Sequence, residues 1–185
     1  MKKQLKSILI LALFLSVTLL SCSNSNEDVN ADASSPPPAG VGGKWSYGTF
    51  SPSSFWGTDG GYNGSAYEQA MAFDFASNGT YEMYVMNIAT YYNCRTGAYT
   101  YFKGQVKFDE ANQSITLTPL QGTQRGEYSC ASGKNFKRDA TAEEIQKAHQ
   151  TFYYSTETDS KGQPALRLYS DKNDTQGAQL TKGNW

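Results

Sequence analysis

Side chains that carry out chemistry are scarce in this chain. His149 is its only histidine, which excludes a zinc or copper site built from several histidines and would make any Ser-His-Asp triad depend on this one residue. The sequence has no Gly-x-Ser-x-Gly elbow, no Cys-x-x-Cys pair and no phosphate-binding glycine loop ahead of a helix. We therefore expect no catalytic set, no metal ion and no cofactor.

Three carboxylates could still come together. Glu68, Asp74 and Glu82 lie on two neighbouring apolar–polar runs, and paired carboxylates catalyse glycoside hydrolysis. Because they alternate with apolar residues, we expect them to face solvent. An enzyme therefore remains a third hypothesis, after the two binding functions given below.

Residues 1–21 predict a signal peptide and stand outside the fold. Lys2, Lys3 and Lys6 precede an apolar run over residues 8–15, which is too short to cross a bilayer comfortably. The segment that follows, Leu19-Leu20-Ser21-Cys22, resembles the lipobox of bacterial lipoproteins.

That resemblance implies cleavage before Cys22 and acylation of its thiol, with palmitate among the acyl chains, which together anchor such a protein stably in a membrane. Ser23 stands where an aspartate would retain it at the inner membrane, so we expect the outer membrane of the cell envelope. Glu27 and Asp28 resemble an acidic signal for display at the cell surface. The alternative is a domain that faces the periplasm.

The charge and composition of the chain restrict the classes of partner that the protein could bind. Without the three lysines of the leader, 13 of the 16 basic residues remain against 17 acidic ones, so the chain lacks the basic surface that a nucleic-acid partner requires. Residues 22–42 are rich in Ser, Asn, Asp and Pro and predict a disordered spacer. Residues 43–185 are long enough for one domain with a core, which we expect to be a monomer.

The domain is predicted to be all-β. From Gly43 onward, apolar and polar residues alternate with a period of two, and Ser77-Asn78-Gly79 separates two runs as a tight hairpin would. The runs favour an antiparallel up-and-down barrel of about eight or nine strands. One short helix interrupts them, because Thr141 and Glu144 fit a capping box that would place Ile145 and Ala148 against the barrel.

The core of this barrel is expected to be aromatic. Beyond residue 42 the chain has 3 Trp, 13 Tyr and 8 Phe, against 5 Leu, 3 Ile and 2 Val. A buried tyrosine ring leaves a hydroxyl that needs a partner, so several tyrosines would lie at barrel mouths, in a partly wet interior or on an exposed binding face. The alternative is that tyrosine simply suits half-exposed strands.

Two cysteines remain once Cys22 is assigned to the lipid. Cys94 and Cys130 lie in one small domain, and in an oxidising envelope such a pair usually forms a disulfide. A thiol catalyst would need a nearby histidine, and His149 lies on the predicted helix. We therefore predict a Cys94–Cys130 bridge.

The segment Gly43-Lys44-Trp45 at the start of the first strand resembles the Gly-x-Trp motif of lipocalins and bacterial lipocalin-like domains. The hairpin from Phe73 to Tyr81, with its Asn-Gly turn, is similar to the second hairpin of those domains. The resemblance implies a binding barrel in which Trp45 plugs the closed end. Lipocalins usually stack an arginine from the end of the barrel on that tryptophan, whereas the last strand here offers Lys182 and Arg167 lies one strand earlier.

Two binding functions follow. In the first, the barrel binds a small apolar or amphipathic molecule through five inward-facing residues, Tyr67, Met71, Phe73, Tyr81 and Met83. In the second, the domain is a surface glycan-binding or adhesion module that uses the loop aromatics Phe55, Trp56, Tyr62, Tyr91 and Tyr92. An enclosed cavity would favour the first hypothesis, and a filled barrel with an exposed Trp56 would favour the second.

Overall fold

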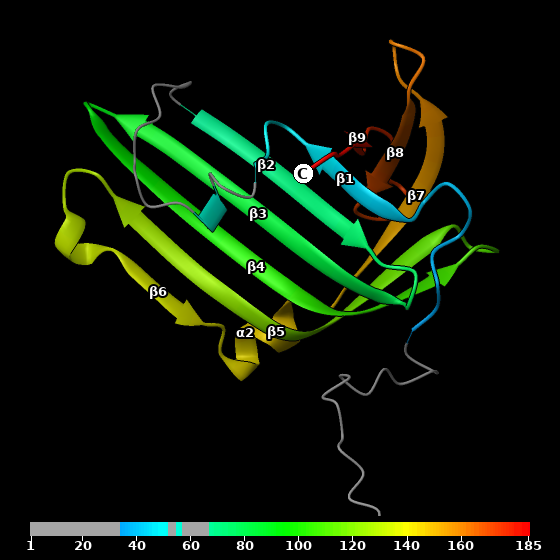
Figure 1. Ribbon diagram of the computed structural model, residues 1–185, viewed down its shortest axis with the longest axis horizontal. Coiled ribbons are helices and arrows are strands. Elements are labelled where there is room, and N and C mark those ends of the chain that lie inside the picture. The colour runs from blue at the N-terminus through cyan, green and yellow to red at the C-terminus, as the bar shows by residue number, and fades with distance from the viewer. Residues whose placement is uncertain (1–33, 52–54, 57–66) are drawn as a thin grey trace, which may run out of the picture.

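The computed structural model describes residues 34–51, 55–56 and 67–185, which form one long, curved β-sheet (Figure 1). Its strands are β1 (Gly43–Tyr47), β2 (Tyr67–Phe75), β3 (Thr80–Tyr91), β4 (Cys94–Asp109), β5 (Ser114–Tyr128), β6 (Phe136–Asp139), β7 (Gln150–Thr158), β8 (Pro164–Tyr169) and β9 (Ala178–Lys182). A 3₁₀ turn, η1 (Ser132–Lys134), and one short helix, α2 (Ala142–Lys147), lie between β5 and β7.

Eight of the strands close a ring. The strands β1, β2, β3, β4 and β5 pair antiparallel in this order, and β5 then pairs with β7, β7 with β8 and β8 with β9. The ring closes where β9 pairs with β1, through Trp45–Lys182 and Ser46–Thr181. Strands that are neighbours in the sequence are thus neighbours in the sheet, apart from β6. The predicted all-β class, with an up-and-down order and one short helix, is confirmed.

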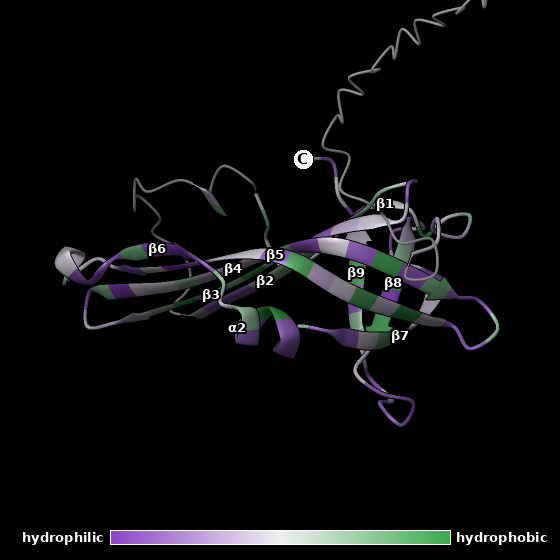
Figure 2. Cartoon of the chain, turned by 90° about the horizontal axis from the view of Figure 1, so that it is seen from below, coloured by the Kyte–Doolittle hydropathy of each residue, from purple (hydrophilic) through white to green (hydrophobic). Residues whose placement is uncertain are grey.

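The ring occupies one end of the molecule, and β2 to β5 run on beyond it as an open sheet to which β6 adds an edge (Figures 1 and 2). β5 serves both parts, because its residues Ser114–Leu117 pair with β7 and its residues Thr123–Gly126 pair with β6. Between these two stretches Leu120 has no partner on β4. This β-bulge bends β5 and shifts the alternation of its inward- and outward-facing side chains by one residue. Beyond the bulge, β5 therefore continues from the ring into the open sheet.

Gly104 lies across from the bulge, where a side chain has no room. A Cβ built on it would come within 2.1 Å of the carbonyl oxygen of Thr118. Glycine at this position allows β4 and the bulged β5 to approach closely.

The inside of the ring is filled with packed side chains. The buried cluster consists of Val41, Trp45, Phe73, Phe75, Tyr81, Met83, Phe102, Val106, Phe108, Ile115, Leu117, Tyr154, Leu166, Leu168 and Leu180. Its aromatic rings touch in pairs, such as Phe73 with Phe75 and Phe75 with Phe108, each at 5.5 Å between centroids. The aromatic core predicted from composition therefore lies here.

Trp45 is a buried member of this core. Its side chain is 1% exposed, its Nε1 donates a hydrogen bond of 2.6 Å to the carbonyl of Val41, and the ammonium of Lys182 lies 4.2 Å from the centre of its ring. Arg167 instead pairs with Glu157 at 2.8 Å. The cation on Trp45 is therefore a lysine from the last strand, in a cation–π contact that also joins the first strand to the last.

The packed chain begins before the expected boundary at Gly43. The amide of Ser35 donates to the carbonyl of Val106 at 2.9 Å, the hydroxyl of Ser35 accepts from the amide of Phe108 at 2.7 Å, and Val41 is buried. Residues 34–42, which the composition places in a disordered spacer, thus lie against the ring. The backbone amide and the side-chain hydroxyl of Ser35 bind this segment to β4, and a polar composition does not reveal such bonds.

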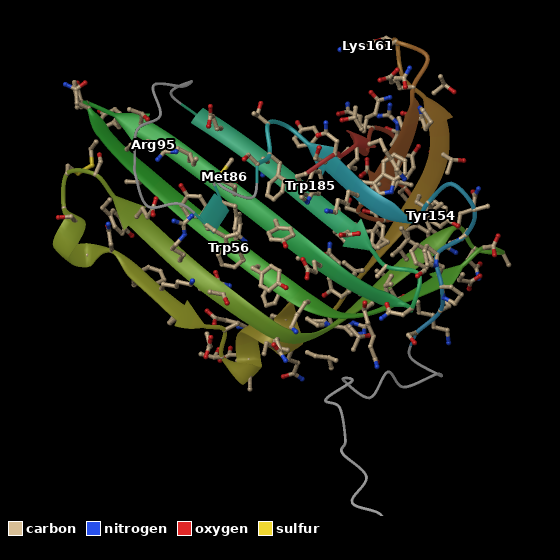
Figure 3. All side chains as sticks on the ribbon, in the orientation of Figure 1. Trp56, Met86, Arg95, Tyr154, Lys161 and Trp185 are labelled. Carbon is tan, nitrogen blue, oxygen red and sulfur yellow. A yellow bond between two sulfur atoms is a disulfide. The ribbon has the colours of Figure 1, made fainter. Side chains whose placement is uncertain are left out.

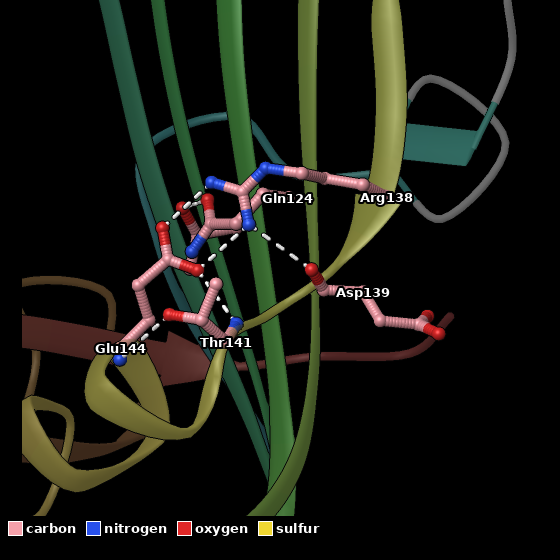
Figure 4. Close-up of polar contacts among 6 residues, drawn as sticks. Gln124, Arg138, Asp139, Thr141 and Glu144 are labelled. Atoms are coloured by element: carbon pink, nitrogen blue, oxygen red, sulfur yellow. Dashed lines mark hydrogen bonds and ion pairs between the residues drawn. The ribbon is translucent and has the colours of Figure 1, made fainter.

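α2 has the capping box predicted for it. The hydroxyl of Thr141 accepts from the amide of Glu144 at 3.2 Å and the Glu144 carboxylate accepts from the amide of Thr141 at 2.8 Å. Arg138 of β6 holds the same carboxylate with two bonds of 2.7 Å (Figure 4), and these contacts lower the pKa of Glu144 to about 2. Ile145 and Ala148 pack against the ring core as expected.

The disulfide between Cys94 and Cys130 is present, with 5.1 Å between the two Cα atoms. Cys94 begins β4 and Cys130 lies just beyond the end of β5. The bridge therefore clamps the two longest strands at the end of the open sheet that is farthest from the ring.

Replacing each of two tryptophans by alanine tests which one the fold depends on. Trp45→Ala removes the largest fully buried side chain and its contact with Lys182, and should lower the free energy of unfolding by about 3–5 kcal/mol. Trp56→Ala removes a side chain that is 40% exposed and should cost less than about 1 kcal/mol. Urea denaturation of both variants measures the difference, and equal losses would mean that Trp45 does not close the ring.

Candidate binding site on the outer face of the open sheet

The five residues proposed to line a ligand cavity lie in three different environments. Phe73, Tyr81 and Met83 are buried members of the ring core, and Met71 is half-buried at its edge. Tyr67 begins β2 opposite Ala89, and its side chain lies outside the described residues. Within the described part of the chain, the structure therefore brings three of the five together as core rather than as the walls of a cavity.

Tyr81 is the exception within this core. Its hydroxyl is buried without a hydrogen-bond partner among the described residues, and burial raises the pKa of this phenol well above its ordinary value. A buried, unpaired hydroxyl is costly, so Tyr81 lowers the stability that its aromatic ring contributes to the core.

A cleft of about 370 Å³ opens at the edge of the ring core, where Met71 lies. Met71, Phe152, Leu168 and Ala178 line it with apolar side chains, and the β8–β9 loop contributes Ser170, Asp174, Gln176 and Gly177. Asp174 braces that loop, because its carboxylate accepts hydrogen bonds from the amides of Ser170, Gln176 and Gly177 at 2.9–3.0 Å. The same bonds lower the pKa of Asp174 to about 2.

The loop aromatics are also divided. Phe55 is buried, Trp56 is 40% exposed, and Tyr91 and Tyr92 are 74% and 87% exposed. Tyr62 lies outside the described residues. The expectation that Phe55 would contact a ligand is therefore not supported by its position, because its ring packs against Tyr84 and Tyr99 at 5.1 and 5.7 Å.

Tyr91 and Tyr92 lie at the tip of the β3–β4 hairpin, with their rings 4.4 Å apart. Tyr91 pairs with Cys94, and the two residues between them, Tyr92 and Asn93, have φ of 43° and 62°. Two left-handed residues in a two-residue loop form the turn that suits the twist of a hairpin. The exposed tyrosine pair is thus fixed by the turn and, next to it, by the disulfide.

A second aromatic cluster covers the outer face of β2 to β5, on the opposite side of the sheet from the ring core. We call it the aromatic platform, and it consists of Phe50, Phe55, Trp56, Tyr84, Tyr99, Tyr101 and Trp185. Trp56 stands edge-on against Phe55 at 4.9 Å and Tyr101 at 5.5 Å. Figure 3 shows Trp56 and Trp185 on the same broad face of the sheet.

Charged side chains contact the aromatic platform and fix its position. The guanidinium of Arg125 is buried 3.8 Å from the centre of the Tyr99 ring, pairs with Glu127 at 2.5 Å and donates to the backbone carbonyl of Phe55. This last bond fixes the chain that carries Trp56. The ammonium of Lys137 on β6 lies 5.0 Å from the Trp56 ring centre, so a cation stands beside the exposed indole.

A cleft of about 300 Å³ adjoins the platform at Tyr101. Thr123 and Asp139 contribute a hydroxyl and a carboxylate to its lining, and Leu120, Ala140 and Ile145 contribute apolar surface. The cleft lies beside the part of β5 that pairs with neither β7 nor β6. The bulge in this part of the strand therefore also makes room beside Tyr101.

Sequence reasoning missed most of the platform. Tyr84, Tyr99 and Tyr101 occupy positions that alternate with the inward-facing residues, and none of them is among the residues predicted from the sequence to contact a ligand. The signal was present, because large aromatics recur at outward positions of two adjacent strands, which indicates a second buried face. The carboxylates expected to face solvent are on this outer face: Glu82 accepts a hydrogen bond from the Tyr84 hydroxyl, and Asp74 lies 4.0 Å from Lys44.

No family model, curated protein or solved structure matches this chain. Among the described residues, no group of three or more His, Cys, Asp and Glu side chains is placed to hold a metal ion. In the same part of the chain, no helix is long and apolar enough to span a membrane.

Titration of Asp174 tests the brace of the β8–β9 loop. Because its folded pKa of about 2 lies below the ordinary 3.8, its stabilisation is present above pH 4 and is lost as the pH falls toward 2. Carbon-detected NMR should therefore find the midpoint of its carboxyl near 2. Asp174→Ala should speed amide exchange of Gln176 and Gly177 at least tenfold, whereas Asp159→Ala, in the β7–β8 loop, should leave both unchanged.

Proposed function

We propose that the protein is a lipid-anchored binding module that recognises glycans through the aromatic platform on the outer face of its open sheet. One observation carries this proposal: Trp56 is substantially exposed, yet its ring packs against Phe55 and Tyr101, and the backbone carbonyl of the preceding residue, Phe55, accepts a hydrogen bond from Arg125. The filled interior of the ring supports the same choice between the two binding functions, because Phe73, Tyr81 and Met83, three of the five residues proposed to surround an enclosed ligand, belong to the packed core.

The chemistry of the platform suits a sugar ring. The faces of Trp and Tyr are apolar and flat, and they can pack on the C–H face of a pyranose while leaving its hydroxyls free. Because Trp56 is already held in place, little side-chain entropy is lost on binding. The cleft beside Tyr101 adds the few polar groups that orientation requires, with Thr123 and Asp139 as partners for hydroxyls of a neighbouring sugar.

The positions of Ser35 and of the Tyr91–Tyr92 hairpin at opposite ends of β4 are consistent with a domain that extends away from a membrane anchor. Ser35 contacts Val106 toward the end of β4, whereas Tyr91 and Tyr92 lie beside Cys94 at its start. Twelve residues of strand separate the two places, or about 40 Å. If Cys22 carries the lipid and the outer membrane holds it, the tyrosine tip and the open sheet can extend away from the anchored end.

The cleft at Met71 favours a second candidate function, the binding of a small amphipathic molecule. Its apolar floor and polar loop are typical of sites at the mouths of β-barrels, and its volume falls in the lower part of their range. Met71 is the one member of the proposed cavity residues that would contact such a molecule there. Met71→Ala should weaken that binding and leave glycan binding unchanged.

Glycan binding is tested with the full-length protein on an array of bacterial and host oligosaccharides, followed by calorimetry with the best binder. Trp56→Ala should lower the affinity at least tenfold, or about 1.4 kcal/mol, with little change in folding. Tyr92→Ala is the matched control, because it removes an even more exposed aromatic ring at the far hairpin. If Trp56→Ala binds as well as the natural chain, or if no oligosaccharide binds, the proposal is wrong.

A further inference from the structure

A third cleft, of about 600 Å³, lies on the outer surface of the ring over β7 and β8. Its lining includes Tyr153, Ser155 and Tyr169 on the strands, Asn112 and Gln113 in the β4–β5 turn, and Lys172 and Thr175 in the β8–β9 loop. Around the ring, β9, β1 and β2 lie between this cleft and the platform strands β3 and β4 on one side, and β5 lies between them on the other. Neither of the functions above uses it.

Two tyrosines form the floor of this cleft. Tyr153 and Tyr169 are directly opposite each other on β7 and β8, and both are half-buried. The hydroxyl of Tyr169 lies 3.1 Å from that of Ser155, and the ammonium of Lys172 lies 5.4 Å from the centre of the Tyr153 ring. The floor therefore offers aromatic surface with hydroxyl groups at its margin.

Internal hydrogen bonds shape both rims. In the β8–β9 loop, the carboxylate of Asp171 accepts from the amides of Asn173 and Asp174 at 2.7 and 3.1 Å, and Asp174 braces the remainder as described above. In the β4–β5 turn, Asp109 accepts from the amide and the side chain of Asn112 at 3.1 and 2.7 Å. These carboxylates are engaged by the rims that they build.

Gln113 is held in an unusual conformation at the edge of the cleft. Its φ of 49° is in the left-handed region, which is unfavourable for a residue with a side chain. Its carbonyl accepts the amide of Tyr154 at 2.8 Å. The strained turn thus fixes where the Gln113 side chain stands relative to the tyrosine floor.

We propose that this cleft is a second saccharide site, which takes one or two neutral pyranose rings stacked on Tyr169 and Tyr153. Amide, hydroxyl and ammonium groups of Gln113, Ser155, Thr175 and Lys172 are the hydrogen-bond partners for sugar hydroxyls. An acidic sugar is disfavoured, because the carboxylates of Asp171 and Asp174 line the cleft and Lys172 is the one cation among its lining residues. The volume exceeds what a single small ion or water cluster needs and lies in the range of ordinary ligand sites.

The test uses the full-length protein with isotope labelling, titrated with neutral hexasaccharides of β-1,4-linked glucose, xylose and mannose and with an acidic hexagalacturonate. At least one neutral probe should shift the ring resonances of Tyr153 and Tyr169 and the side-chain amide of Gln113. The shifts should persist in Trp56→Ala, which removes the centre of the platform, and the affinity should fall at least tenfold in Tyr169→Ala.

Gln113→Ala provides a second variant that leaves the core intact, and its affinity for the same probe should fall about threefold or more. The second site is overturned if no neutral probe shifts these resonances, if only the acidic probe does, or if the shifts disappear in Trp56→Ala. It is also overturned if Tyr169→Ala and Gln113→Ala, with the Trp45 resonances unchanged, bind as the natural chain does. These outcomes leave glycan binding at the platform a separate question, which the array and Trp56→Ala decide.

Discussion

Packing inside the strand ring is the constraint on which the other features depend. The interior of an eight-stranded ring has room for little more than its own side chains. Here large aromatic side chains such as Trp45, Phe73 and Phe108 fill that interior, rather than small residues. Trp45 and Lys182 meet at the seam where the first strand joins the last, so closure of the ring and burial of its largest side chain depend on the same contact. A core of this kind excludes water and supports a rigid outer surface.

The same sheet has a second apolar side. Beyond the ring, β2 to β5 continue as an open sheet, and their outward side chains are covered by Phe50, Phe55 and Trp185 from distant parts of the chain. An isolated sheet extension would expose both faces and an edge. Here the platform covers one face, and β6 and the disulfide secure the edge and the far end. The bulge at Leu120 makes this arrangement possible by letting one strand belong to both parts.

The alternation of residues predicted the class of fold because burial on one face of a strand imposes a period of two. Local signals predicted local structures equally well: the turn around Gly79, whose φ is 79°, the capping box at Thr141 and the Cys94–Cys130 bridge. The tertiary features were harder. Phe55 lies in a glycine- and serine-rich stretch and is nevertheless buried, because Arg125, seventy residues away, holds its carbonyl.

Long-range contacts explain the remaining differences. Residues 34–42 have the composition of a spacer, but the amide and hydroxyl of Ser35 hydrogen-bond to β4, which composition does not report. Phe136–Asp139 is too short and too polar to predict a strand, and it becomes one only because β5 offers a free edge beyond its bulge. Tyr84 was not singled out from the sequence, because one buried face is enough to explain the alternation, whereas the structure also buries this side chain on the opposite face.

The central claim is that the inside of the ring holds the fold together and that recognition takes place outside it. Native mass spectrometry of the full-length protein, purified without added ligands, tests this claim most directly. The account predicts the mass of the polypeptide and its covalent modifications with no apolar molecule retained. One apolar molecule bound per chain, and lost when Met83 or Phe73 is changed to a larger or smaller residue without unfolding the protein, would contradict it.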